Sequence, residues 1–475
     1  MKSVIMNVNL DKNTTALIVF VIAAALLSTA QTVVTTGVVG IMSDFHVSST
    51  LAQWVYSSFL LVLGVMIPIS AYIARRFKIR KILIVSLIIF LIGTVLAFIA
   101  QNIFILILAR VIQGIGAGVL LPVTQIVLLK IIPKDKWQVY MGLFGFIIGV
   151  VPALAPTVGG YIIDTMGWRI IFLLFAIATL ILIAIAVLFV KLDFETGDYP
   201  LDVISLILSI IACVGLLFGL TNFADYGAHL TNTITPIVIG VIALVIFVYR
   251  QFNIESPLLD LRILIHKYYF FGTLFSSILY FTMCGLYVLM PLFVQGVCNQ
   301  SATTSGIILL PATLVMIVFN FVGPLLAQKF GVQKILILSC IFSIVGYYIM
   351  STYTASTSME YMIATQIIRA IGAGLGLMPA VTWTLSVAKG NIEDATAINN
   401  TVRQIIGASG SAVAATLLTV FTGGYVAHNK ITVGAFSQTS LFMAALCVIS
   451  LVIVILFIKD GVEDTDEDSP VEETA

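Results

Sequence analysis

Long apolar runs recur along the whole 475-residue chain, separated by short polar segments. A helix that crosses the hydrocarbon core of a bilayer needs about 20 mostly apolar residues. Fourteen runs meet this requirement, so the pattern predicts an all-α polytopic membrane protein with fourteen transmembrane helices. The predicted spans cover residues 16–40, 51–74, 82–100, 103–130, 138–163, 170–190, 202–222, 234–250, 270–295, 303–327, 335–354, 360–387, 400–422 and 438–458.

The composition excludes several classes of function. Hydrophobic residues make up 60% of the chain and charged residues only 9%, whereas a soluble protein carries about a quarter charged residues. The net charge of +1 argues against a nucleic-acid partner. Neither a catalytic triad nor a metal-ligand spacing occurs, so we expect no enzyme, metal or cofactor. The phosphate-binding pattern G-x-x-x-x-G-K-[ST] is also missing, so ATP is not the direct energy source.

Basic residues alternate between the connections and predict the orientation. The segment from Arg75 to Lys81 carries five of them, and every second later connection is also basic. Cytoplasmic loops carry the excess of Lys and Arg. We therefore expect a multi-pass protein of the cell membrane with both termini in the cytoplasm and an uncleaved first helix.

An internal repeat divides the chain into two halves. The segment A-R-R-F-K-I-R-K-I-L at Ala74–Leu83 aligns with A-Q-K-F-G-V-Q-K-I-L at Ala327–Leu336, and I-G-A-G follows in both halves. We predict a six-helix bundle over residues 1–200, two inserted helices over 201–255, a second six-helix bundle over 256–459 and an acidic disordered tail over 460–475.

Each half places an arginine inside an apolar run. Helical spacing puts Arg110 on one stripe with Gln113 and small residues, and Arg369 precedes the second I-G-A-G. A charge within a membrane span is costly and normally faces protein or water. The alternative is a packing seam with a snorkelling arginine. Together with polar positions of the first span, the candidates for transport and coupling are Arg110, Gln113, Arg369, Gln31 and Thr32.

Two further groups of residues suggest a moving, ligand-binding interior. In the fifth span, small and helix-bending residues share one face, which suits close packing and rocking of helices; the alternative is ordinary glycine-rich packing. Aromatic and methionine side chains elsewhere suit amphipathic organic ligands, although each could instead contact lipid or pack between helices. The first group includes Gly149, Pro152, Pro156 and Gly160, and the second is Trp54, Tyr56, Tyr280, Met283 and Tyr287.

These motifs resemble the major facilitator superfamily, and within it the fourteen-helix drug:proton antiporters of the multidrug and lincomycin-resistance type. The resemblance implies the major facilitator fold, alternating access and proton antiport. In the loop after the second span, the residues that match the family motif include Arg76, Arg80 and Lys81. In the fourth span they include Arg110 and Gln113, and in the fifth span they are Pro156, Gly159 and Gly160.

The chain departs from this family pattern at acidic positions. Arg75 stands where the loop motif has aspartate, and Ala30 stands where the first span has an acid. We place no Asp or Glu in the middle of a span. Asp164, at the outer end of the fifth span, is therefore the candidate acid for proton coupling, with pairing to Arg169 as the alternative.

The leading hypothesis is a monomeric exporter of amphipathic drugs or other organic compounds by proton antiport with alternating access. Its partners are then a small organic substrate, protons and the lipid bilayer. A gradient-independent or single-metabolite facilitator of the same fold is the alternative. A non-transporting membrane sensor or scaffold is the hypothesis from another class.

Overall fold

The computed structural model describes residues 12–47, 49–192, 194, 197, 202–226, 230–254, 257–300, 302–389, 391–421 and 432–461, and within these ranges all regular secondary structure is helical. The predicted tail beyond residue 461 and the first eleven residues lie outside the described part. The helices are α1 (Lys12–Val33), α2 (Val38–Phe45), α3 (Ser49–Arg76), α4 (Ile79–Phe98), α5 (Ile103–Ile131), α6 (Trp137–Met166), α7 (Arg169–Phe189), α8 (Val203–Tyr226), α9 (Thr235–Asn253), α10 (Lys267–Gly296), α11 (Ala302–Phe330), α12 (Val332–Ser351), α13 (Met359–Ser386), α14 (Ile392–Phe421) and α15 (Val433–Phe457), with short turns η1 (Val34–Gly37), η2 (Lys134–Lys136), η3 (Leu230–Ile234) and η4 (Leu261–Ile265).

Fourteen elements are long enough to cross a bilayer, in agreement with the number of predicted spans. Twelve described helices satisfy both length and apolarity, and α6 and α14, with 30 residues each, supply the other two. The first predicted span is not one continuous α-helix, because the 3₁₀ turn η1 at Val34–Gly37 separates α1 from α2.

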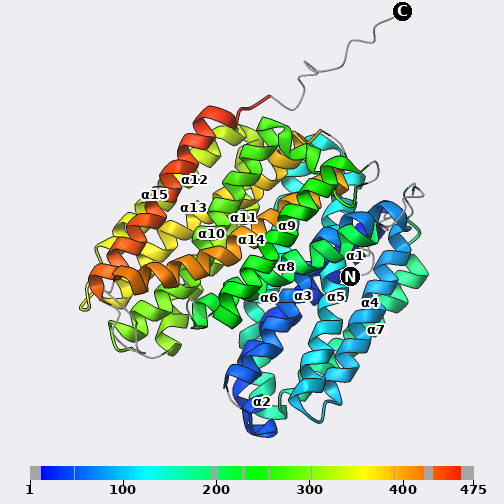
Figure 1. The fold of residues 1–475 in the computed structure, drawn as a ribbon, viewed down its shortest axis with the longest axis horizontal. Helices are drawn as coiled ribbons and strands as arrows, with labels where there is room; N and C mark the ends of the chain where they lie inside the picture. Colours follow the sequence, from blue (N-terminus) through cyan, green and yellow to red (C-terminus); the bar gives the residue numbers. More distant parts are fainter. Residues whose placement is uncertain are drawn as a thin grey trace, which may run out of the picture.

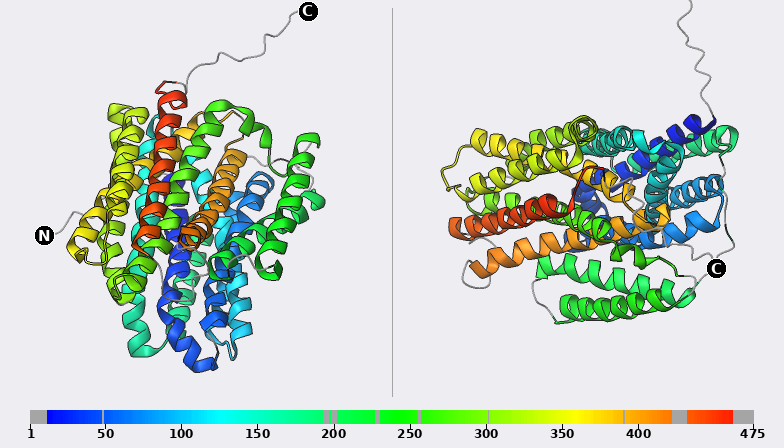
Figure 2. Two further views of the ribbon diagram at one scale, coloured as in Figure 1. Left: turned by 60° about the vertical axis from the view of Figure 1, so that its left-hand side comes forward. Right: turned by 90° about the horizontal axis from the view of Figure 1, so that it is seen from above.

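The helices form two bundles with a hairpin beside them (Figures 1 and 2). Helices α1–α7 form one bundle and α10–α15 the other, and the inserted helices α8 and α9 pack on each other. Gly215 and Gly240 let these two backbones touch, because a Cβ on Gly215 would lie 2.7 Å from the Gly240 Cα. Helix α8 also packs against α3 and α14, so the hairpin contacts both bundles.

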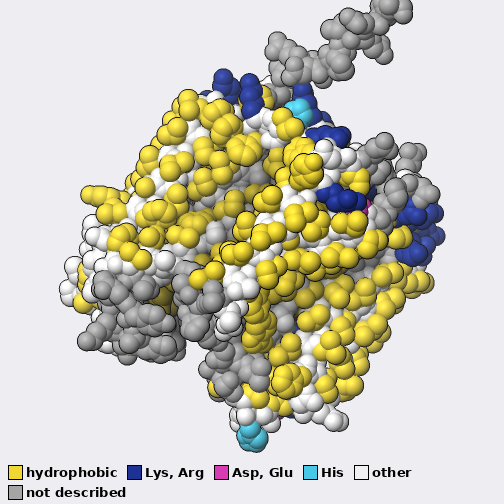
Figure 3. All heavy atoms as spheres, in the orientation of Figure 1, with side chains coloured by type: hydrophobic (Ala, Val, Ile, Leu, Met, Phe, Trp, Pro, Cys, Tyr) yellow, Lys and Arg dark blue, Asp and Glu magenta, His cyan; other side chains and the backbone are white. Residues whose placement is uncertain are grey.

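The outer surface is apolar, and the cations gather at one end (Figure 3). Side chains such as Phe104 and Tyr161 point outward with 69% and 74% of their surface exposed, as expected for residues that face lipid rather than water. We call the end that holds Arg75–Lys81 and Lys130–Lys136 the basic end. It also contains the first turn of α14.

Two of the differences from the predicted boundaries involve acids. Helix α14 begins at Ile392, eight residues before its predicted span, so Glu393 and Asp394 lie in its first turn and are buried, not in a loop. Asp460, which we assigned to the tail, accepts hydrogen bonds from the backbone N–H groups of Val332 and Gln333 at 2.6 and 3.2 Å. It thereby caps the start of α12.

Candidate functional site

Arg110 lies inside the first bundle and joins three helices. Its side chain is fully buried. Nε donates to the Val55 carbonyl of α3 at 2.9 Å, and Nη1 donates to Oε1 of Gln113 at 2.6 Å. Gln113 Nε2 in turn donates to Oγ1 of Thr94 on α4 at 2.8 Å. The guanidinium also lies 4.3 Å from the ring centre of Phe59. The arginine therefore faces protein, and the snorkelling alternative is wrong.

The second bundle repeats this arrangement around Arg369 on α13. Arg369 is 4% exposed, its Nε donates to Oε1 of Gln366 at 3.1 Å, and its guanidinium lies 6.0 Å from the ring centre of Tyr347. The amide precedes the arginine by three residues here, whereas Gln113 follows Arg110 by three. The two halves thus conserve the chemistry of the site and not the order of its residues.

A group of polar side chains lies where the two bundles face each other. Tyr56 of α3 lies near Gln31 of α1 and within electrostatic range of Arg110 and, across the bundles, of Cys284 and Tyr287 on α10. Tyr287 keeps 43% of its surface exposed although it belongs to this interior group. We call Gln31, Tyr56, Tyr280, Cys284, Tyr287 and Arg403 the central cluster.

Arg403 of α14 completes the central cluster, and sequence reasoning did not select it. Its guanidinium lies 5.7 Å from the ring centre of Tyr280, and Nη2 donates to Oδ1 of Asn400 at 2.7 Å. Nη1 is buried and makes no hydrogen bond within the described part of the chain. The arginine in T-A-I-N-N-T-V-R-Q was the available signal, because it is a charge within a predicted span.

The other candidate ligand-binding residues divide between two places. Met283 is half-buried on α10, one residue before Cys284 of the central cluster. Trp54 instead packs against Phe218 of the inserted helix α8, with ring centres 5.4 Å apart. Thr32 donates to the Thr29 carbonyl of its own helix at 3.4 Å.

At the basic end, a buried ion pair connects the two bundles. Nη1 of Arg75 on α3 lies 2.7 Å from Oδ2 of Asp394 on α14, and the two side chains are 8% and 0% exposed. Nη2 of Arg75 donates to the Leu258 carbonyl at 2.7 Å. A second pair, between Lys130 of α5 and Glu393, lies beside it. We call Arg75–Asp394 the cross-bundle pair.

An amide bridge lies between the cross-bundle pair and the central cluster. Asn400 Nδ2 donates to Oε1 of Gln125 on α5 at 3.0 Å, while Asn400 Oδ1 accepts from Arg403. Asn400 is six residues after Asp394 on α14. The cross-bundle pair, the amide bridge and the central arginine therefore follow one another along the first three turns of α14, at positions 394, 400 and 403.

The glycines of α6 lie against the opposite bundle. A Cβ added to Gly142 would lie 3.1 Å from the Phe321 carbonyl of α11. A Cβ on Gly145 would lie 2.8 Å from Cγ of Met378 on α13, and a Cβ on Gly149 would lie 3.1 Å from Cγ1 of Ile317 on α11. Gly159, by contrast, contacts Val33 within its own bundle. The side chains of Pro152 and Pro156, and Gly160, lie outside the described residues.

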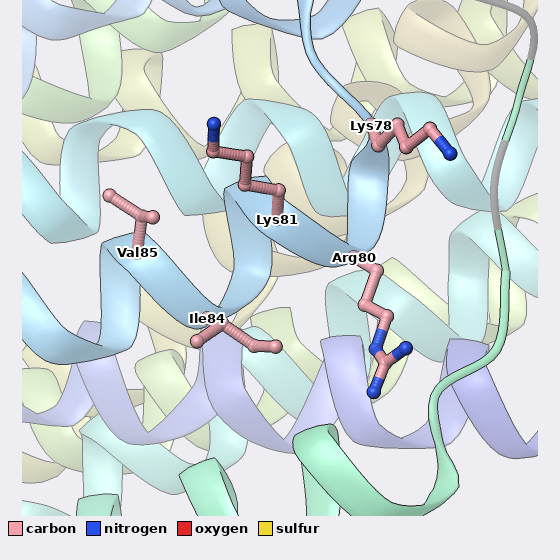
Figure 4. Close-up of a pocket in the computed structure, with 5 residues that line it drawn as sticks. All are labelled: Lys78, Arg80, Lys81, Ile84 and Val85. Carbon is pink, nitrogen blue, oxygen red and sulfur yellow. The ribbon is translucent and has the colours of Figure 1, made fainter.

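The remaining predicted residues lie near the two ends of the helices. At the basic end, Arg76 is half-buried and Nη2 of Arg80 donates to the Val187 carbonyl at 2.6 Å. Arg80 and Lys81 line a shallow pocket with Lys78, Ile84 and Val85, in which the three cations point in different directions (Figure 4).

The opposite end holds the first candidate for proton coupling. The side chain of Asp164 lies outside the described residues. Arg169, its proposed partner, pairs with Asp44 at 2.7 Å. The indole N–H of Trp168 and the Arg169 guanidinium lower the pKa of Asp44 below its usual value. Among the described residues, no group of three His, Cys, Asp or Glu could hold a metal ion.

Comparisons with known proteins agree with this architecture. The model of the Major Facilitator Superfamily matches residues 20–411. An uncharacterized MFS-type transporter of Bacillus subtilis, YcnB, is 33% identical over 391 residues, which are 81% of each chain. The lincomycin resistance protein LmrB of B. subtilis is 28% identical over 84% of each chain. The multidrug export protein EmrB of Haemophilus influenzae is 25% identical over 88% of this chain and 83% of its own.

A solved structure also shares the fold. The crystal structure of the human organic anion transporter MFSD10 superposes with a TM-score of 0.64, covering 93% of this chain and 99% of that one. The sequence identity is 11%, so this likeness concerns the fold alone.

Proposed function

Because the chain belongs to the major facilitator superfamily and is a membrane transporter, we propose that it exports amphipathic drugs or other organic compounds in exchange for protons. The relatives named for lincomycin resistance and multidrug export support this direction of transport and this kind of substrate. In this proposal the protein acts as a monomer in the cell membrane, with both termini and the basic end in the cytoplasm. It works by alternating access between its two bundles.

The cross-bundle pair is the observation that carries the proton-coupling part of this proposal. Proton antiport requires a group that titrates, and arginine does not. Asp394 supplies a carboxylate that is buried at a contact between the bundles. The charged or titratable groups around it are Arg75, Glu393, Asp260, Lys130 through its pair with Glu393, and Tyr269.

Protonation of Asp394 changes the contact between the bundles. The proton neutralises the carboxylate and so removes the ion pair between Asp394 and Arg75, and the loss of one partner's charge from a buried pair costs several kcal/mol. The basic end then opens, and Asp394 releases to the solution on that side the proton that it took up from the opposite side of the membrane. Reformation of the pair closes the basic end again, so one proton is exchanged in each cycle.

A transport assay in proteoliposomes tests this proposal. We expect a pH step to drive uphill transport by the wild type, whereas Asp394→Asn loses uphill transport and retains counterflow. Asp202→Asn is the matched control, because Asp202 is also paired with an arginine, Arg250 at 2.8 Å, but within the inserted hairpin. Uphill transport by Asp394→Asn at the wild-type level contradicts the role of Asp394.

A facilitator that needs no gradient is the second candidate, since the described part of the central cluster contains no carboxylate. Counterflow without any pH-driven accumulation by the wild type would favour it. The sensor or scaffold hypothesis has weaker support, because the family and the named relatives are transporters.

A further inference from the structure

Three arginines lie within the spans without a carboxylate partner. Arg110, Arg369 and Arg403 form no ion pair with any described residue, and the described carboxylates lie at the ends of helices. Two of them also leave a guanidinium nitrogen buried without a hydrogen bond, Nη2 of Arg110 and Nη1 of Arg403. The interior of the described structure is therefore positively charged.

Neutral groups only partly compensate these charges. The hydrogen bonds go to the Val55 carbonyl and to the amide oxygens of Gln113, Gln366 and Asn400. A buried cation is costly unless it is paired with an anion as well as hydrogen-bonded. A mobile anion that enters the space between the bundles can supply this pairing.

The same geometry disfavours a cationic ligand. Organic cations bind to carboxylates or to the faces of aromatic rings. The rings nearest the three arginines are already occupied, since Arg110 lies over Phe59, Arg369 over Tyr347 and Arg403 over Tyr280. A cationic ligand in the central cluster would have to displace an arginine from its ring or lie beside its charge.

We propose that the central cluster binds an amphipathic organic anion, whose charged group pairs with Arg403. This inference rests on the proposed function, because it takes the central cluster as the substrate site. Arg403 is the residue of choice because Asn400 holds Nη2 while Nη1 is left to meet a ligand oxygen. The hydroxyl groups of Tyr280 and Tyr287 can donate to the same anion, and Met283 offers an adaptable apolar contact on α10.

A set of probes with one ring system and three charges tests the proposal. Calorimetry on the purified full-length protein at pH 7 compares 2-naphthoate, 2-naphthamide and 2-naphthylmethylammonium. We expect 2-naphthoate to bind about tenfold tighter than the amide, and the ammonium to bind most weakly. Binding of the ammonium as tightly as the carboxylate overturns the proposal without any variant.

Variants then assign the preference to Arg403. Arg403→Gln should lower the affinity for 2-naphthoate about tenfold and leave that for 2-naphthamide unchanged, which also shows that the protein is folded. Arg403→Lys should retain part of the preference because it keeps the charge. Arg262→Gln, which replaces a surface arginine at the basic end, is the control and should bind both probes with the wild-type affinities. An unchanged preference in Arg403→Gln overturns the assignment.

The binding assay separates this inference from the proposed function. It needs neither a membrane nor a pH gradient, so a failure of proton coupling leaves its result intact. If the anion preference is found but a pH step drives no transport, the proton-antiport proposal fails and the anion site stands. If a pH step drives transport and the probes show no anion preference, the anion site fails and the proton-antiport proposal stands.

Discussion

Arg110 shows at the scale of one residue how a charge is held within a membrane protein. The guanidinium donates in two directions, to Val55 on another helix and to Gln113 on its own, and it covers the ring of Phe59. A planar group with several donors suits this arrangement, whereas the ammonium of lysine is a single point charge. The residue therefore organises the packing of α3, α4 and α5 and also makes the electrostatic potential inside the bundle more positive.

Substitution of Arg110 tests this role. Arg110→Ala should abolish transport, because the carbonyl and amide oxygens around it lose their donor, and Arg110→Lys should restore little activity because it cannot reach both partners. Substrate efflux from cells, normalised to the amount of protein in the membrane, measures both effects. Wild-type efflux by Arg110→Ala would show that the arginine serves only packing.

Asp460 provides a second test at the residue scale. Its carboxylate accepts from the backbone N–H groups of Val332 and Gln333 at the start of α12, where Gly331 has a φ of +96°. Loss of such a cap costs about 0.5–2 kcal/mol. We therefore expect a lower melting temperature for Asp460→Ala in detergent. Glu360→Ala, which removes an exposed acid from α13, is the control, and equal melting of the two variants contradicts the cap.

At the scale of elements, α6 is the helix on which the two bundles meet most closely. Its glycines at 142, 145 and 149 permit this approach, since each lies against α11 or α13 of the opposite bundle. Small residues favour such packing in lipid, where close backbone contact stabilises association. Gly142, Gly145 and Gly149 of this helix thus lie between the bundles.

A larger side chain on α6 should interfere with closure of the basic end. A Cβ on Gly142 would lie 3.1 Å from both the Phe321 carbonyl and the Pro324 ring, which cannot turn aside as a flexible side chain can, so Gly142→Val should force the bundles apart and lower the transport rate about tenfold or more. Gly306→Val is the matched control, because a Cβ there meets no atom within 4 Å. Equal transport rates in proteoliposomes for the two variants would contradict tight packing at this site.

The inserted hairpin is more than a passive addition. The two helices that we predicted as an insert over residues 201–255 contain a polar network at their basic end. Arg250 pairs with Asp202 at 2.8 Å, and Gln251 donates to Ser205 at 2.6 Å and accepts from the Leu259 N–H at 3.1 Å. The hairpin is thus attached to the segment that leads into the second bundle, while α8 also packs on the first.

At the scale of the whole molecule, the sequence predicted the architecture better than the site. Apolar runs and the repeat predicted the helices and the two bundles, because lipid requires long apolar segments. The search for apolar runs placed Asp394 outside a span, because the first turn of α14 is polar and resembles a loop. Its partner Arg75 is 319 positions away, a contact that no local pattern indicates. Arg403 was overlooked although it is a charge within the predicted span 400–422.

The described polar contacts between the bundles lie toward the basic end, where the cross-bundle pair, the Lys130–Glu393 pair and the Gln125–Asn400 bridge lie close along α14. The structure is therefore a state in which this end is held together. In an alternating-access cycle these contacts must break, and the buried pair is the most costly of them to disrupt, at about 3–5 kcal/mol when one partner is removed.

Exchange of the two charges is the most direct test of this account. We predict that Arg75→Asp and Asp394→Arg each abolish pH-driven transport in proteoliposomes, since each places two like charges between the bundles. The double exchange should recover a substantial part of the wild-type rate because it rebuilds the pair in reverse. Full pH-driven transport by either single variant, or no recovery in a folded double variant, would contradict a cross-bundle pair that couples protons to opening.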